Sequence, residues 1–90
     1  MSVLLITYDH SKMSLIVDPM PNFVKEYKHV QLSINSYAIE TDEKTRTIYN
    51  KIIPFLNINA RLFIVTLTQP FACQDIEHVR EWLRKHLPEN

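Results

Sequence analysis

Glycine is absent from this chain of 90 residues. This absence excludes the glycine-rich loops that hold phosphates in nucleotide-binding proteins, because those loops need glycine for tight turns and for close approach of the backbone. Turns that require a positive φ must then use asparagine or aspartate, which tolerate the left-handed region better than other residues do. Such residues occur at the expected turns, at 9–11, 35–36 and 57–59.

Cysteine is almost absent as well, since Cys73 is the only one. It cannot form an internal disulfide, which favours a reducing compartment. A single thiol among apolar residues is more typical of a small buried side chain than of a nucleophile. No basic segment precedes the short apolar run near residue 3, and no apolar stretch is long enough to cross a bilayer. We therefore expect a cytoplasmic protein with no membrane contact.

Charge of one sign is not in excess. Ten basic side chains balance ten acidic ones, and the pI is near 6.9. A dedicated nucleic-acid binder usually has a basic excess. The balance removes a global attraction to nucleic acid, although a local patch would be enough for binding. Lys44, Arg46 and Lys51 predict one basic face on a helix, which is more often a solvated face than a binding site.

Two apolar runs predict strands. Residues 3–8 and 61–67 each place branched apolar side chains at successive positions, which suits strands covered on both faces, in the centre of a sheet. Residues 29–41 alternate between apolar and polar, with a change of phase at Asn35 and Ser36. This pattern indicates either a bulged strand or a tight hairpin of two short strands.

Three helices are predicted between and after the strands. The first is a short helical turn over 22–28, because Pro21 is tolerated at a first helical position. Asp42 is predicted to cap the second helix, and Pro54 to shorten its last turn. Asp75 is predicted to cap the third, whose apolar stripe consists of Ile76, Val79, Leu83 and Leu87.

The order of these elements indicates the fold class. An apolar content of 46% and a charged content of 22% are typical of a globular protein. We predict a single α+β domain over 1–90, a ferredoxin-like βαββαβ sandwich with an additional C-terminal helix. Two helices would cover one face of the four-stranded sheet. The terminal helix or a second subunit must cover the other face, and we therefore predict a homodimer.

Three stretches also resemble a known family. Residues 5–9 read Leu-Ile-Thr-Tyr-Asp, 29–34 read His-Val-Gln-Leu-Ser-Ile, and 59–67 read Asn-Ala-Arg-Leu-Phe-Ile-Val-Thr-Leu. They are similar to the first, second and fourth strands of the small CRISPR-associated Cas-two proteins and their relatives, the VapD toxins and the SinR-family proteins of bacteria and phages. The chain departs from that pattern in its short, proline-interrupted first helix and in keeping only Lys12 of the basic run after the aspartate.

The resemblance implies a metal site at a dimer interface. In the family, the aspartates that end the first strand of two protomers come together and are proposed to hold a divalent cation for phosphodiester cleavage. Asp9 is the matching position and is the predicted catalytic and metal-binding residue. Mg²⁺ prefers carboxylate oxygens, and a two-fold axis lets one Asp per chain supply two ligands. Tyr8, His10 and Lys12 are the predicted nucleic-acid contacts.

Two functions stay open at this point. One is a dimer of a bacterium, phage or mobile element that binds or processes RNA or DNA, with metal-dependent endonuclease activity as its enzymatic form. The other is a non-catalytic protein–protein interaction module that keeps the fold and binds a host or phage protein. The Tyr8-Asp9 strand end favours the first function. The neutral charge and the lone Lys12 favour the second, in which Tyr8 belongs to the core and His10 to a solvated turn.

Overall fold

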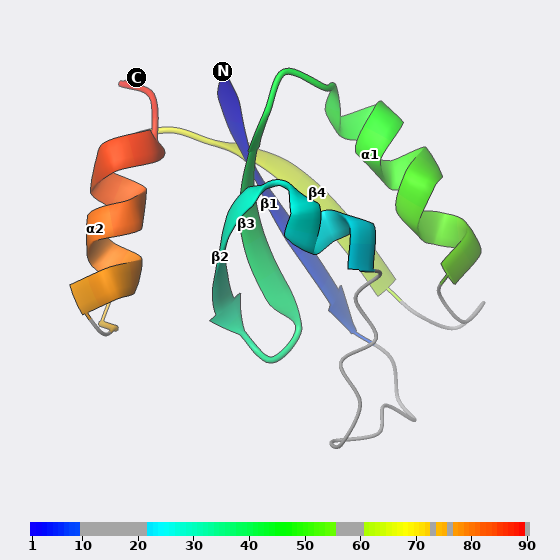
Figure 1. Ribbon diagram of the computed structural model, residues 1–90, viewed down its shortest axis with the longest axis horizontal. Coiled ribbons are helices and arrows are strands. Elements are labelled where there is room, and N and C mark those ends of the chain that lie inside the picture. Colours follow the sequence, from blue (N-terminus) through cyan, green and yellow to red (C-terminus); the bar gives the residue numbers. More distant parts are fainter. Residues whose placement is uncertain (10–21, 56–60, 73, 76, 90) are drawn as a thin grey trace.

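The protein is described by a computed structural model in which residues 1–9, 22–55, 61–72, 74–75 and 77–89 are placed. Within these residues, four strands form one antiparallel sheet in the order β2-β3-β1-β4, with helical elements on both of its faces (Figure 1). The domain is therefore α+β, and its strand order is compatible with the expected ferredoxin-like arrangement. The elements are β1 (Ser2–Asp9), η1 (Asn22–Glu26), β2 (Lys28–Ser33), β3 (Ser36–Thr41), α1 (Thr45–Ile52), η2 (Ile53–Phe55), β4 (Arg61–Leu67) and α2 (Glu77–His86).

One face of the sheet is covered by η1 and α1. Leu4, Ile6 and Tyr8 alternate along β1, so their side chains lie on the same face and pack against Ile48 and Ile52 of α1. All five side chains are buried. Burial of each large apolar side chain contributes roughly 1.5–3 kcal/mol, so this layer is the main source of stability on this face.

Helix α2 covers part of the other face. Its residues Val79, Leu83 and Leu87 recur at helical spacing and pack against Val30 of β2 and Ala38 of β3. Figure 1 shows α2 beside β2, well away from α1. The end of the helix is held by Gln69, whose side-chain amide donates to the Leu87 carbonyl at 2.9 Å and whose backbone N–H donates to the Pro88 carbonyl at 2.8 Å. The terminal helix thus provides one of the two covers expected for this face.

The predicted central position is confirmed for β1 but wrong for β4. In the described part of the chain β4 pairs with β1 alone, so it is an edge strand. Leu62 and Ile64 pack against the α1-side core, whereas Phe63 and Val65 point to the other face and are 59% and 49% exposed. A run of apolar residues is compatible with a central strand. It is equally compatible with an edge strand such as β4, whose second face is left partly exposed by the described residues. Periodicity alone therefore could not separate the two.

Residues 29–41 combine both predicted alternatives. A turn at Ile34 and Asn35 joins β2 to β3 as a tight hairpin, and the pairing register shifts between Gln31 and Ser33 as in a β-bulge. No residue among those described has a positive φ. The hairpin therefore turns without the left-handed Asn that the lack of glycine led us to expect.

The predicted helix starts are displaced by a few residues. Helix α1 begins at Thr45, and its N-cap residue Lys44 makes no side-chain capping hydrogen bond, so the prediction that Asp42 caps this helix is wrong. The turn before the helix is held by Thr41, whose hydroxyl accepts from the Glu43 backbone N–H at 3.0 Å. Pro54 lies in η2, where the last turn tightens as predicted.

The other two helices are close to their predicted positions. The short turn expected over 22–28 is the 3-10 helix η1, which ends at Glu26. Helix α2 begins at Glu77, two residues after Asp75. None of the helices in the placed segments is long and apolar enough to cross a membrane.

Candidate functional site

Asp9, the predicted catalytic and metal-binding residue, is the last residue of β1 and pairs in register with Arg61 of β4. The Asp9 side chain and the whole of His10 and Lys12 lie outside the described residues. One carboxylate per chain is an oxygen donor suited to Mg²⁺, but it leaves most of the six ligands to water or substrate. Among the residues that are placed, no group of three or more His, Cys, Asp or Glu could hold a metal ion. The magnesium site at Asp9 stays a prediction.

Tyr8, the predicted neighbour of that site, lies in the core. Its side chain is 1% exposed and packs with Leu4 and Ile6, and its hydroxyl lies 3.5 Å from the Ile34 carbonyl, at the limit of a hydrogen bond. The Tyr8 backbone N–H donates to the Asn35 carbonyl at 3.1 Å. Stacking of this ring on a base would require it to leave the core. The structural alternative, Tyr8 as a core residue, fits this position, and its contact with nucleic acid stays a prediction.

A partly exposed apolar surface lies on the α2 side of the sheet, on β4 and the neighbouring part of β1 that α2 and the other described residues leave open. We call this surface the open face, and define it by Leu5, Phe63, Val65 and Leu67. Leu5 pairs directly with Val65, so the side chains of the two strands lie side by side. Phe63 and Val65 are mostly exposed, and Leu5 and Leu67 are half-buried. Contiguous exposed apolar side chains of this kind mark interaction surfaces.

A groove separates the open face from α2 and has a volume of about 390 Å³. Leu5 and Leu67 line it from the sheet, Phe71 from the segment after β4, and Leu83 from α2. Its lining is mostly apolar, which suits an apolar side chain better than a charged ligand. The sequence signal for this region was present in the unbroken apolar run of β4, but it was interpreted as burial within one chain.

A polar cluster on the opposite face consists of Tyr27, just after η1, Glu43, just before α1, and Lys51 of α1. Tyr27 Oη donates to Glu43 Oε2 at 2.7 Å, and Lys51 Nζ donates to Glu43 Oε1 at 2.6 Å and to Tyr27 Oη at 3.4 Å. The hydrogen bonds from Lys51 and Tyr27 hold the pKa of the Glu43 carboxyl below its ordinary value. Burial raises the pKa of the Tyr27 hydroxyl, and its hydrogen bond to Glu43 raises it further.

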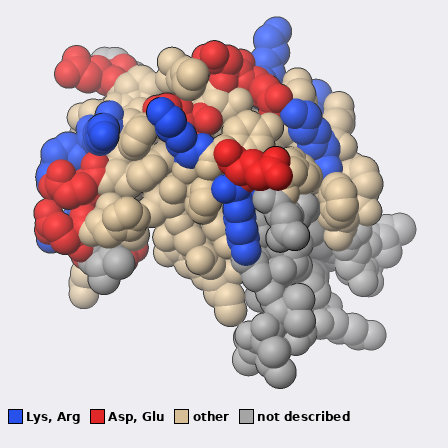
Figure 2. All heavy atoms as spheres, in the orientation of Figure 1, with Lys and Arg blue, Asp and Glu red and all other residues tan. Residues whose placement is uncertain are grey.

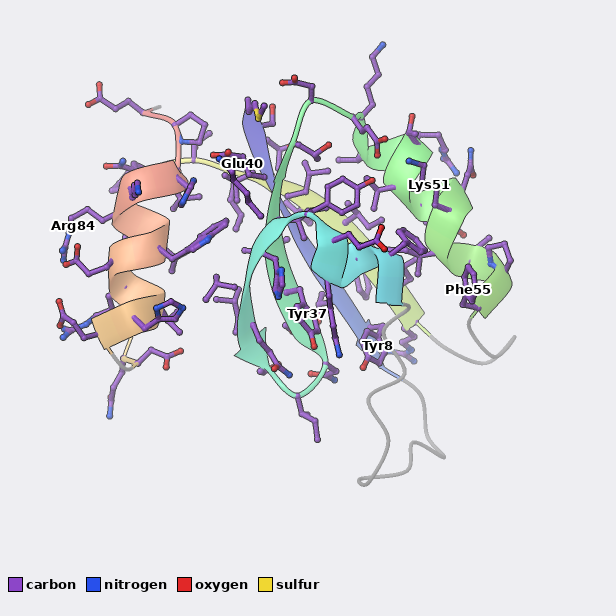
Figure 3. All side chains as sticks on the ribbon, in the orientation of Figure 1. Tyr8, Tyr37, Glu40, Lys51, Phe55 and Arg84 are labelled. Carbon is purple, nitrogen blue, oxygen red and sulfur yellow. The ribbon has the colours of Figure 1, made fainter. Side chains whose placement is uncertain are left out.

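This cluster borders a pocket of about 510 Å³ lined by Phe23, Glu26, Tyr27, Lys51 and Phe55. Figure 3 labels Lys51 and Phe55, which come from α1 and η2. Because the Lys51 charge is neutralised by Glu43, the predicted basic face of this helix loses one of its three members. Arg46, another member, lies over the Tyr49 ring at 5.1 Å. On the face shown in Figure 2, basic side chains are interspersed with acidic ones.

Glu40 and His86 form a polar link between β3 and the last turn of α2. His86 Nδ1 lies 2.7 Å from Glu40 Oε2 and donates to it, since a carboxylate can only accept. Both side chains are mostly buried, and the Trp82 ring lies 4.3 Å from the His86 ring. The hydrogen bond from His86 lowers the pKa of Glu40 below its ordinary value. Sequence reasoning missed this pair, because its members are far apart in the chain and no motif connects them.

Comparisons with known protein families, with curated proteins and with solved structures found no match to this chain. The resemblance to Cas-two proteins therefore rests on the three strand segments quoted from the sequence.

Proposed function

We propose that this protein is a non-catalytic interaction module that acts as a homodimer. The observation that carries the proposal is the open face, on which Phe63 and Val65 are 59% and 49% exposed. A monomer would keep these side chains in water, whereas a second copy would bury them. The formal net charge of zero means that two copies do not repel one another through overall charge.

The arrangement of elements supports a ferredoxin-like fold as the scaffold. The strand order is β2-β3-β1-β4, and every neighbouring pair is antiparallel. The connection from β1 to β2 carries η1, and that from β3 to β4 carries α1, with both on one face. Helix α2 is then the additional C-terminal helix. In this scaffold the half of the sheet that α2 leaves uncovered is the surface for a second subunit.

The energetics predict a weak dimer. Full burial of an exposed large apolar side chain gains roughly 1.5–3 kcal/mol, but Phe63, Val65 and Leu5 are already partly buried in one copy. Association costs about 4–15 kcal/mol in lost freedom of motion. Because the gain from both copies is only comparable with this cost, we expect the dimer to form at high micromolar concentration.

Light scattering after gel filtration tests the proposal. The wild type should be a dimer at high micromolar concentration, and Phe63→Glu should be a monomer, because it would bury a charge in the interface. Phe55→Glu is the matched control, since Phe55 is 64% exposed and packs with Phe23 on the α1 side. A monomeric wild type would overturn the proposal, as would equal dissociation of both variants.

Metal-dependent cleavage of nucleic acid is the second candidate function. The observation that favours it is the position of Asp9 at the end of a central strand, as the resemblance to Cas-two proteins implies. Activity on RNA or DNA should then require Mg²⁺ or Mn²⁺ and vanish in Asp9→Asn, which keeps the size of the side chain but removes the charge that attracts the cation. If the protein is only an interaction module, purified wild type shows no metal-dependent cleavage of single-stranded or duplex substrates.

A further inference from the structure

The two edge strands of the sheet differ in how they are protected. Edge strands are usually shielded from further pairing by charged side chains, proline or a β-bulge. Strand β2 carries Lys28 and His29, and its pairing register shifts between Gln31 and Ser33. Residues 62–67 of β4 contain no charged residue and no proline, and the described pairing of β4 with β1 has no register shift. Of the two edges in the described sheet, β4 is therefore the one suited to pair with a further strand.

The direction of the backbone polar groups along β4 follows from its neighbour β1. The Tyr8 N–H donates to the Asn35 carbonyl at 3.1 Å, on the β3 side of the strand. In antiparallel pairing the N–H and C=O of one residue point to the same side, and successive residues alternate. The odd-numbered residues of β1 therefore face β4, where they pair with Phe63 and Val65 among others. The even-numbered residues of β4 then direct their N–H and C=O groups to the outer edge: Leu62, Ile64 and Thr66.

We propose that in the homodimer the outer edge of β4 pairs antiparallel with β4 of the second copy, with Ile64 on the two-fold axis. This inference rests on the proposed homodimer and adds which edge and which register join the copies. Ile64 is the midpoint of β4 and faces outward, so it can form a hydrogen-bonded pair with Ile64 of the second copy. The same register pairs Leu62 with Thr66 of the second copy, and Thr66 with Leu62. An axis at either neighbouring residue leaves one of the three outward residues without a partner in β4.

This register also covers the exposed side chains of the open face. Phe63 lies opposite Val65 of the second copy in a non-hydrogen-bonded pair, in which Cβ atoms are about 4.5–5.5 Å apart. The two side chains are 59% and 49% exposed in one copy. Pairs of an aromatic and a β-branched side chain across neighbouring strands are stabilising. The second copy thus lies beside β4 and covers Phe63 and Val65 from the side.

The α1 side of β4 has room for a paired strand. Ile64 borders a pocket of about 280 Å³ that is also lined by Thr45, Arg46 and Tyr49 of α1. The Ile64 side chain is only half-buried there, so α1 does not cover it completely. In the proposed register the Ile64 side chains of the two copies lie side by side on this face. The pocket is the space that receives the second of them.

The arrangement keeps the two α2 helices apart. An axis at Ile64, perpendicular to the sheet, joins the two sheets edge to edge in the order β2-β3-β1-β4-β4-β1-β3-β2. Helix α2 packs on Val30 of β2 and Ala38 of β3. Because the two copies of β2 are the outermost strands of the joined sheet, the two α2 helices lie at its opposite ends.

Removal of one outward N–H group provides the first test. Thr66 is exposed and its N–H points away from β1, so proline at this position is compatible with an edge strand. Thr66→Pro should raise the dissociation constant of the dimer at least tenfold in sedimentation experiments, because it removes the donor to Leu62 of the second copy. Thr66→Ala keeps the N–H group and is the matched control, which should dimerise as the wild type does. Unchanged dimerisation of Thr66→Pro would overturn the proposed pairing.

Disulfide trapping between two single-cysteine chains provides the second test and does not depend on the fold of the proline variant. In a Cys73→Ser background, Phe63→Cys and Val65→Cys are prepared separately and then mixed under mild oxidation at high micromolar concentration. The mixture should give a covalent dimer with one chain of each kind. Each variant alone should give little, because identical positions other than 64 are separated by more than about 7 Å, which is too far for a disulfide.

The trapping experiment also has outcomes that overturn the inference. Self-linking of Phe63→Cys or of Val65→Cys without any mixed product would place the axis elsewhere and refute the register. Absence of every covalent dimer, from a wild type that dimerises in light scattering, would refute the edge pairing. A wild type that is monomeric would instead refute the homodimer itself, so the failure of the proposed function and that of the pairing can be told apart.

Discussion

At the scale of single residues, the link between Glu40 and His86 carries a testable pH dependence. The hydrogen bond from His86 lowers the pKa of Glu40 in the folded protein, so folding favours the ionised carboxylate. The stability gained is complete above the ordinary carboxyl pKa and is lost as the pH falls through the lowered value. Glu40→Gln should therefore lower the free energy of unfolding by about 1 kcal/mol at neutral pH and have almost no effect at strongly acidic pH.

Urea unfolding of wild type and Glu40→Gln between about pH 6 and pH 3 measures this effect. The free energy of unfolding of the variant no longer depends on protonation at position 40, so the difference between the two proteins reports on the Glu40 carboxyl. Glu26→Gln is the control, since Glu26 is an exposed carboxylate on η1. A difference between wild type and Glu40→Gln that stays constant over the whole pH range would contradict the assigned role. The contact between Glu40 and His86 could not be predicted from the sequence, because β3 and α2 approach one another only in the folded protein.

At the scale of elements, the start of α1 lacks the residues that usually stabilise a helix N-terminus. Its N-cap residue Lys44 makes no side-chain capping bond, and its first turn contains no acidic residue. A lysine at this end also opposes the helix dipole. We predict that Lys44→Asp raises the free energy of unfolding by about 0.5–2 kcal/mol, because aspartate can accept from the free N–H groups of the first turn. Lys44→Ala, which removes the charge but cannot cap, separates the two effects in the same denaturation experiment.

The type and bounds of a strand or helix were easier to predict from the sequence than the neighbours that surround it in the fold. The bounds of β4 were predicted correctly from its apolar run. The change of phase within 29–41 predicted either a bulged strand or a tight hairpin, and the structure has a hairpin that contains a register shift. The edge position of β4 was not predictable, because the burial of Phe63 and Val65 depends on which strands lie beside and above them. Asp42 was interpreted as a cap from its residue type, but the turn at Thr41 delays the helix to Thr45.

At the scale of the whole molecule, the α+β architecture followed from the order of strands and helices. What the sequence left open was the cover of the second face, for which the terminal helix and a second subunit were both candidates. Among the described residues, α2 covers β2, β3 and the start of β1, where Val3 is fully buried, and leaves Phe63 and Val65 of β4 mostly exposed. The predicted site at Asp9 depends on residues 10 and 12, which lie outside the described segments, so the fold could be tested more fully than that site.

The position of β1 between β3 and β4 also has a consequence for the folding pathway. Leu5 pairs with Ala38 on one side and Val65 on the other, so every contact of this strand closes a long loop. Only the β2–β3 hairpin is local among the described strand pairs. We expect refolding in milliseconds to seconds, as is typical of non-local topologies. Pulse-labelling hydrogen exchange should show Ala38 protected through its β2 partner before Leu5, and early protection of Leu5 would contradict this order. Strand β1 is thus expected to join only after the hairpin, and β4, whose described pairing is with β1 alone, cannot join the sheet before it.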